Sequence, residues 1–238
     1  MILFVFEGAR REVEIFNVLK RLFWGSETVI VSVYDCSIDA LYQEMIKIGD
    51  DADIAGLLMA RYKGRPDNPF ASVTRSDDFS EIYLVFDYDF HDTSRTVEQL
   101  NSQLFYLLDY FKEETDKGKL YINYPMVEAI AYTKKLPDSS FDTYTVGRLD
   151  CKKFKQLAAE FSFYPNYDFI RRSDDAILKE NWLHLRSQNV KKARMMCRGE
   201  ISQREILASQ VQDYECQAGC QVAILSGFAL LLYDWLGY

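Results

Sequence analysis

The chain has 238 residues, the size of one large domain or of one domain with an appendage. Its 48% hydrophobic and 15% aromatic residues are enough to bury a core, which excludes a disordered or low-complexity chain. The formal net charge of −8 argues against a protein that coats nucleic acid through a global basic field. It does not exclude an enzyme with a local basic groove.

Strand and helix patterns alternate along the first half of the chain. Residues 2–6 are a continuous apolar run, as expected of a strand covered on both faces, and "EIYLVF" at 81–86 predicts a second strand. β-Branched and aromatic residues predict two further strands at 28–34 and 119–123. The spacing of apolar residues predicts helices at 10–23, 37–48, 52–62, 95–114 and 125–132. This order predicts an α/β domain over residues 1–135, with a mainly parallel sheet and helices on both faces.

The second half of the chain has mostly helical patterns. They predict helices at 150–161, 173–196, 202–215 and from Gln217 onward. We therefore expect a helical C-terminal region, residues 136–238, packed on the α/β domain. Its apolar stretch 222–238 is interrupted by Ser226 and Asp234 and is shorter than the roughly 20 residues that span a bilayer. We interpret it as a buried helix and expect no membrane partner.

The cysteines and the first residues bear on the cellular compartment. The five cysteines are scattered, and only Cys216 and Cys220 lie close together, without a second pair. This spacing argues against a zinc site and is typical of reduced thiols. The stretch "MILFVFEGARRE" has no basic segment or cleavage site of a signal peptide. We therefore expect a cytoplasmic protein.

Acidic residues follow three of the four predicted strands. Glu7 and Gly8 come after the first strand, Asp87 and Asp89 after the third, and Glu128 shortly after the fourth. Sites in open parallel sheets form beyond the carboxyl ends of the strands. Two carboxylates as close as Asp87 and Asp89 repel each other unless a cation lies between them, and such oxygen ligands suit Mg²⁺ or Mn²⁺. The alternative is that the two aspartates only cap a strand end and a turn.

Three stretches carry a resemblance to a known family: "ILFVFEGARREVEIF", "EIYLVFDYDFHD" and "LYINYPMVEAI". Together they resemble a TOPRIM domain, the metal-binding module of topoisomerases, primases and OLD-family nucleases, over residues 1–135. The pattern is a Glu-Gly after the first strand, an Asp-x-Asp after a later strand, and a further acid beyond. The short chain with a helical tail is most similar to the small stand-alone OLD-like and RloB-like TOPRIM nucleases of bacterial anti-phage (abortive-infection) systems.

The resemblance implies a metal-dependent nuclease that hydrolyses phosphodiesters in DNA or tRNA. Asp87 and Asp89 would bind Mg²⁺ or Mn²⁺, and Glu7 would act as general acid/base or as a metal ligand. Glu128 would be a further ligand, and Gly8 would let the backbone approach the phosphate. The resemblance also implies a toxic effector that works with an ATPase partner subunit, and a homo-oligomer is an open expectation.

One position departs from the family pattern. Some OLD-like nucleases have a glutamate four residues after the first one, where this chain has Arg11, with Glu12 next. The number of metal ions, one or two, is therefore open. Glu12 or Glu14, one to two helical turns on, could support a second metal ion, but we interpret Glu12 as an ordinary solvated helix residue.

Candidate substrate-binding residues are basic or can be protonated. Lys191, Lys192 and Arg194 lie in a basic run at 186–198, where they could contact phosphates. A solvated helix face is the alternative interpretation. Arg11 and His91 lie beside the predicted acidic residues, and His91 could equally be a loop residue.

Two other functions stay open. "LVFDYDFHDT" also resembles the first motif of a haloacid-dehalogenase-like phosphatase, in which Asp87 would be the nucleophile. That family needs a later acidic pair after a strand, here Asp174 and Asp175, and it leaves Glu7 and Gly8 unexplained. The chain could also be a non-catalytic effector or sensor subunit, with the aromatic stretch 161–169 as an interface.

Overall fold

The computed structural model describes residues 1–25, 28–33, 36–49, 51–88, 96–162, 167–197, 199–216 and 221–237. Its contacts divide the chain into two compact units. The first unit comprises Met1–Val85 and Tyr106–Leu120, and the second comprises Phe86–Phe105 and Tyr121–Tyr238. The boundaries between these units fall inside three secondary-structure elements, whereas the predicted domain boundary was a single point in the chain at residue 135. That division into domains stays a prediction.

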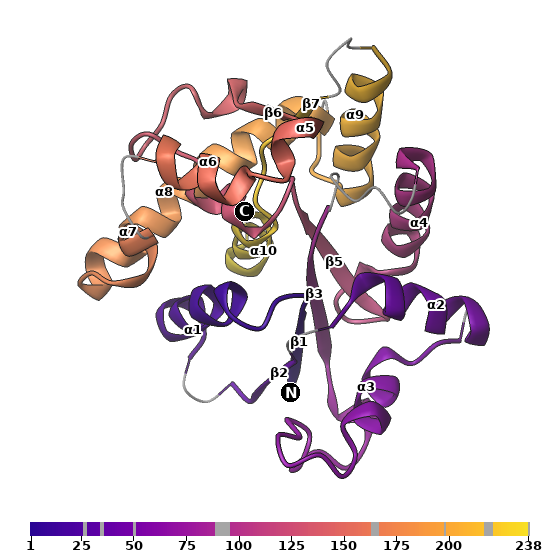
Figure 1. Ribbon diagram of the computed structural model, residues 1–238. Helices are drawn as coiled ribbons and strands as arrows, with labels where there is room; N and C mark the ends of the chain where they lie inside the picture. The colour runs from indigo at the N-terminus through magenta and orange to yellow at the C-terminus, as the bar shows by residue number, and fades with distance from the viewer. Residues whose placement is uncertain are drawn as a thin grey trace. The chain divides into compact units, whose positions relative to one another are not determined.

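The sheet has five strands in the order β2-β1-β3-β5-β4. The strands are β1 (Ile2–Phe6), β2 (Ile30–Val33), β3 (Glu81–Asp87), β4 (Lys112–Glu113) and β5 (Gly118–Asn123). β1 pairs in parallel with both β2 and β3, and only the short β4 is shown to run antiparallel to its neighbour β5. The predicted α/β class with a mainly parallel sheet is confirmed (Figure 1).

Both faces of β1 are covered, because all five of its residues are buried. The first unit contains α1 (Arg11–Phe23), α2 (Ile38–Ile48), α3 (Ile54–Tyr62) and the 3₁₀ turn η1 (Ser76–Asp78). α1 lies on one side of the strands, and α2 and α3 lie on the other (Figure 1). On the α1 side, the Phe16 ring contacts those of Phe4 and Phe6, with centroids 4.4 and 4.8 Å apart.

Side chains cap the starts of α2 and α3. Ser37 caps α2 by accepting a hydrogen bond from the Ala40 N–H at 3.4 Å. Asp53 caps α3 in the same way, accepting from the Gly56 N–H at 2.9 Å. Both side chains provide an acceptor for amides that have no partner within the helix.

The predicted helix at 95–114 is too long at its C-terminal end. α4 is Val97–Tyr110, and the chain then turns back so that β4 can pair with β5. Gly118 has a φ of +119°, and a Cβ there would lie 2.9 Å from a Leu84 methyl group. Glycine at this position therefore permits both the turn and the close approach to β3.

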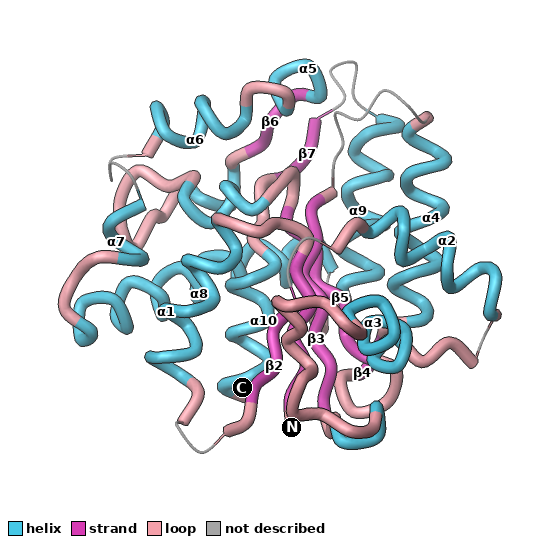
Figure 2. Tube along the Cα trace, turned by 60° about the horizontal axis from the view of Figure 1, so that its bottom comes forward, coloured by secondary structure: helices cyan, strands magenta, loops and turns pink. Residues whose placement is uncertain are grey.

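The second unit is mainly helical. Its remaining elements are η2 (Val127–Ala131), η3 (Phe141–Thr143), β6 (Thr145–Gly147), α5 (Arg148–Cys151), α6 (Phe154–Phe161), α7 (Asp168–Arg171), α8 (Asp175–Cys197), α9 (Gln203–Cys216), β7 (Gln221–Ala223) and α10 (Gly227–Leu236). Figure 2 shows β6 and β7 side by side near α5. In the ranges that the structure describes, no helix is both long enough and apolar enough to cross a membrane.

Three predictions for the second unit were wrong. The expected helix at 125–132 is a short 3₁₀ turn, η2, after the cis Tyr124–Pro125 bond. The expected helix at 150–161 is interrupted after Cys151, giving α5 and α6.

The third error concerns the apolar helix expected from Gln217. Residues 221–223 form β7 and pair antiparallel with β6, a strand that the sequence did not predict. The helix α10 begins only at Gly227. Three-residue strands have too few positions to show alternation, which is why only tertiary pairing reveals them.

Candidate functional site

Asp87 and Asn123 meet where their strands end, Asp87 in β3 and Asn123 in β5. Asn123 is 1% exposed, and its Nδ2 donates to Asp87 Oδ1 at 3.0 Å. Its Oδ1 accepts from the Gly227 N–H at 2.8 Å. Because the oxygen already faces a backbone donor, the amide has one consistent orientation, with its NH₂ group toward Asp87. The half-buried Asp87 carboxylate is thus held by a buried donor.

The chain after Asp87 stays attached to the end of β5. The Tyr88 N–H donates to the Asn123 carbonyl at 3.0 Å, and the Tyr88 hydroxyl donates to Asn101 Oδ1 at 2.7 Å. Tyr88 is 1% exposed, so its ring is part of the core. These contacts fix the backbone immediately beyond Asp87.

Two buried asparagines cap the N-terminus of α10. Asn123 accepts from Gly227 N–H, and Asn189 of α8 accepts from Ser226 N–H at 2.8 Å. The Nδ2 of Asn189 donates to the Leu185 carbonyl within its own helix. A Cβ at Gly227 would lie 3.1 Å from the Ile122 carbonyl group, tighter than most real contacts. Glycine therefore lets the start of α10 approach the end of β5 closely.

Glu128 lies in η2 and is 5% exposed. Within the described ranges, its carboxylate has no hydrogen bond or ion pair. Neither carboxylate oxygen is among the fully buried polar atoms that have no partner, so burial alone shows no uncompensated charge at Glu128. Carboxylate oxygens are, however, the ligands that divalent cations prefer. Its chemistry therefore fits a cation ligand.

The loop between β1 and α1 in the first unit packs against the first turn of α1, and we call this region, made of Glu7, Gly8 and Glu12, the corner. Glu7 directly follows β1 and is half-buried. The Gly8 N–H donates to Glu12 Oε1 at 3.1 Å, and Glu12 is only 5% exposed. The interpretation of Glu12 as a solvated helix residue was therefore wrong, because its carboxylate folds back onto the backbone of the loop. A Cβ at Gly8 would overlap that carboxylate, which gives glycine a local reason to be there.

Replacing Gly8 with alanine is expected to displace the Glu12 carboxylate and lower the free energy of unfolding by about 1 kcal/mol. Gly8 has no positive φ, so the backbone itself accommodates alanine. A double-mutant cycle with Glu12→Ala, measured by urea unfolding, should give a coupling of about 0.5–1 kcal/mol because the overlap disappears. Strictly additive effects would contradict this account of the corner.

Three residues predicted at or beside the acidic site remain: Asp89, His91 and Arg11. Asp89 and His91 lie outside the described residues. Arg11 pairs with Glu14 of the same helix at 3.3 Å. Among the residues that the structure describes, no three His, Cys, Asp or Glu side chains form a group that could hold a metal ion.

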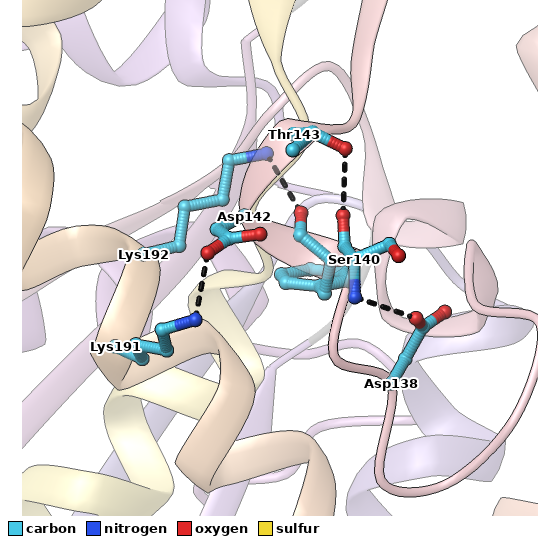
Figure 3. Close-up of polar contacts among 7 residues, drawn as sticks. Asp138, Ser140, Asp142, Thr143, Lys191 and Lys192 are labelled. Carbon is cyan, nitrogen blue, oxygen red and sulfur yellow. Dashed lines mark hydrogen bonds and ion pairs between the residues drawn. The ribbon is translucent and has the colours of Figure 1, made fainter.

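Three basic residues of α8 have partners within the second unit, and Figure 3 shows two of them, Lys191 and Lys192. Lys191 pairs with Asp142 at 2.7 Å, and Arg194 donates to the Tyr233 hydroxyl at 3.1 Å. Lys192 is 3% exposed and donates to the carbonyl oxygens of Phe141 and Tyr144. Lys192 was interpreted as a surface phosphate-binding residue, and its burial does not agree with that role.

Burial lowers the pKa of Lys192 to about 7, against the opposing effect of Asp142. The pKa in the unfolded chain is higher, so between pH 7 and 8.5 the unfolded state binds more protons than the folded state. The free energy of unfolding should therefore rise with pH in this window, by about 1–2 kcal/mol from Lys192 alone. Urea unfolding at several pH values should show a smaller rise in Lys192→Met. Identical pH profiles in both proteins would contradict the lowered pKa.

Asp138 is a buried residue whose carboxylate accepts four hydrogen bonds, and the sequence analysis did not identify it. It is 6% exposed, and its Oδ2 accepts from Thr133 Oγ1, Lys134 N–H and the Tyr144 hydroxyl at 3.0–3.2 Å. Its Oδ1 accepts from Ser140 N–H at 3.0 Å. Burial acts to raise the pKa of Asp138, but these hydrogen bonds outweigh it, so the pKa lies below its usual value. The signal in the sequence was an aspartate after proline and before serines, a pattern typical of side-chain-stabilised turns.

Asn123 was also missed as a site residue. The available signal was a polar residue at the end of an apolar strand, at the sheet edge where the acidic residues were expected.

Comparisons with known proteins give no family for this chain. No protein-family model matches it, and neither the curated proteins nor the solved structures contain a match.

Proposed function

We propose that the protein is a TOPRIM-type nuclease that hydrolyses phosphodiesters in nucleic acid with Mg²⁺ or Mn²⁺. The observation that carries the proposal is the Asp87 carboxylate at the end of β3, held by the buried amide of Asn123. A ligand fixed before the metal arrives loses little side-chain freedom on binding.

The proposed ligands have the chemistry that a hard divalent cation prefers, although no group of three such side chains is present among the described residues. Asp87 and Glu128 offer carboxylate oxygens, the ligands that Mg²⁺ and Mn²⁺ prefer, and the sequence places Asp89 two residues after Asp87. When bound, such a metal activates water and neutralises the leaving oxygen in phosphodiester hydrolysis.

We assign the remaining roles to the chain's own residues. Asn123 orients Asp87. The resemblance gives Glu7 the role of the base that takes the proton of the attacking water. The substrate is DNA or tRNA, and the protein acts in the cytoplasm as the toxic effector of an anti-phage system with an ATPase partner. These biological roles come from the resemblance and stay proposals.

The phosphatase alternative gains no support from the second unit. Asp174 accepts from the Ala176 N–H, so it caps the start of α8, and the element before it is the helix α7. The later acidic pair of that family would follow a strand.

The proposed function is tested by incubating the purified chain with plasmid DNA, single-stranded DNA and tRNA in Mg²⁺, in Mn²⁺ and in EDTA. Cleavage of a nucleic acid only with a divalent metal is the expected result. Hydrolysis of a phosphomonoester such as p-nitrophenyl phosphate, without cleavage of any nucleic acid, would contradict the proposal and favour the phosphatase. Neither activity, together with no metal binding, would favour a binding subunit.

A further inference from the structure

We propose that Asn123 is a positioning residue that couples the N-terminus of α10 to the metal ligand Asp87. The inference rests on the proposed function and extends it, because it assigns control of the site to an element about 100 residues further along the chain. Asn123 acts through Asp87 and is not itself given a role in the reaction.

The Asn123 side chain makes two hydrogen bonds, one with its oxygen and one with its NH₂ group. Its oxygen accepts from the Gly227 N–H at 2.8 Å, and its NH₂ group donates to Asp87 Oδ1 at 3.0 Å. With 1% of the residue exposed, bulk water has almost no access to replace either bond. A shift of the first residue of α10 would therefore move the Asn123 amide and change the hydrogen bond that Asp87 accepts from it.

The first residues of α10 are fixed by packing and hydrogen bonds, so they can hold the Asn123 amide in place. Residues 227–233 of this helix are buried. Gly227 lies so close to β5 that a Cβ would be 3.1 Å from Ile122 O and 3.3 Å from Asn123 Oδ1. The preceding amide, Ser226 N–H, is held by Asn189 of α8. These contacts thus link α8 and α10 to the end of β5.

Asn189 provides a matched control for Asn123. Both are fully or almost fully buried asparagines, and each accepts from one backbone amide at the same helix N-terminus. They differ in their NH₂ groups, since Asn189 donates to the Leu185 carbonyl and Asn123 donates to Asp87. Replacing either one with alanine removes a cap, but only Asn123→Ala removes the donor to Asp87.

The test is a calorimetric titration of Mn²⁺ into the full chain and into Asn123→Ala, Asn189→Ala and Asp87→Asn, with urea unfolding in parallel. Asp87→Asn identifies the heat that comes from this site, as distinct from other acidic surfaces. Both alanine variants should lower the urea midpoint similarly. Asn123→Ala should raise the dissociation constant for Mn²⁺ at the site about 10- to 100-fold, whereas Asn189→Ala should leave it within about twofold.

The outcomes separate this inference from the proposed function. Equal Mn²⁺ affinity in the unaltered chain and Asn123→Ala, or equal weakening in both alanine variants, would overturn the positioning role while leaving the metal site in place. No Mn²⁺ binding that depends on Asp87 in the unaltered chain would overturn the proposed function and this inference with it. If Asn123→Ala does not fold, Asn123→Ser replaces it, because serine is too short to reach Asp87 and should weaken binding in the same range.

Discussion

Asp87→Asn is expected to lower the rate of metal-dependent nucleic-acid cleavage by at least about 1,000-fold. The substitution keeps the size of the side chain but removes the negative charge that a divalent cation requires. The amide oxygen of the new side chain can still accept from the Asn123 NH₂ group, so the contact that orients it is kept. Glu7→Gln is expected to have a comparable effect, because a neutral amide cannot accept the proton of the attacking water.

Glu81→Gln is the matched control for Asp87→Asn. Glu81 is the first residue of β3 and Asp87 is the last, so the two carboxylates lie at opposite ends of one strand. The Glu81 carboxylate accepts from the Tyr83 hydroxyl at 2.8 Å, and an amide oxygen can also accept that bond. Cleavage by Glu81→Gln should stay within about threefold of the unaltered protein, since surface changes rarely alter chemistry elsewhere. Cleavage that survives both Asp87→Asn and Glu7→Gln would refute the assignment of these carboxylates.

Asp138→Ala is expected to lower the free energy of unfolding by about 2–4 kcal/mol. The substitution removes the acceptor of the Lys134 and Ser140 amides and of the Tyr144 hydroxyl. The Thr133 hydroxyl can still donate to the Lys135 carbonyl at 2.9 Å. Asp142→Asn is the comparison, because Asp142 pairs with the exposed Lys191 toward solvent and its loss should change stability far less. Chemical unfolding in urea measures both.

The pH dependence gives a second check on Asp138. Its pKa in the folded protein lies below the usual value, so its contribution to stability is present above about pH 4 and is lost as pH falls through the lowered pKa. The acid side of the stability profile should therefore be less steep in Asp138→Asn than in the unaltered protein. An unchanged profile, or a loss of stability no larger than that of Asp142→Asn, would contradict the role of Asp138 as the acceptor of these hydrogen bonds.

Local signals predicted the α/β class and most of the first unit. The apolar run of β1, the Ser37 cap of α2 and the run that forms β3 each depend on neighbours a few residues away. Such features can be read from one stretch of sequence because their spacing and capping chemistry are local.

Long-range contacts explain what the sequence did not show. The bond from Gly227 to Asn123 joins residues 104 positions apart, so nothing near Asn123 marks it as a helix cap. Lys192 lies among four other basic residues of α8, yet its ammonium group binds carbonyls 48 and 51 positions earlier. Periodicity identifies the helix, but tertiary packing decides which lysine is buried.

The most direct test of the central claim is a crystal structure of the protein grown with Mn²⁺, with the metal located by its anomalous scattering. The account predicts a Mn²⁺ ion bound to an Asp87 carboxylate oxygen at about 2.0–2.2 Å, with Asn123 still donating to the same carboxylate. Mn²⁺ at other acidic residues with none at Asp87, or no bound metal at all, would contradict it.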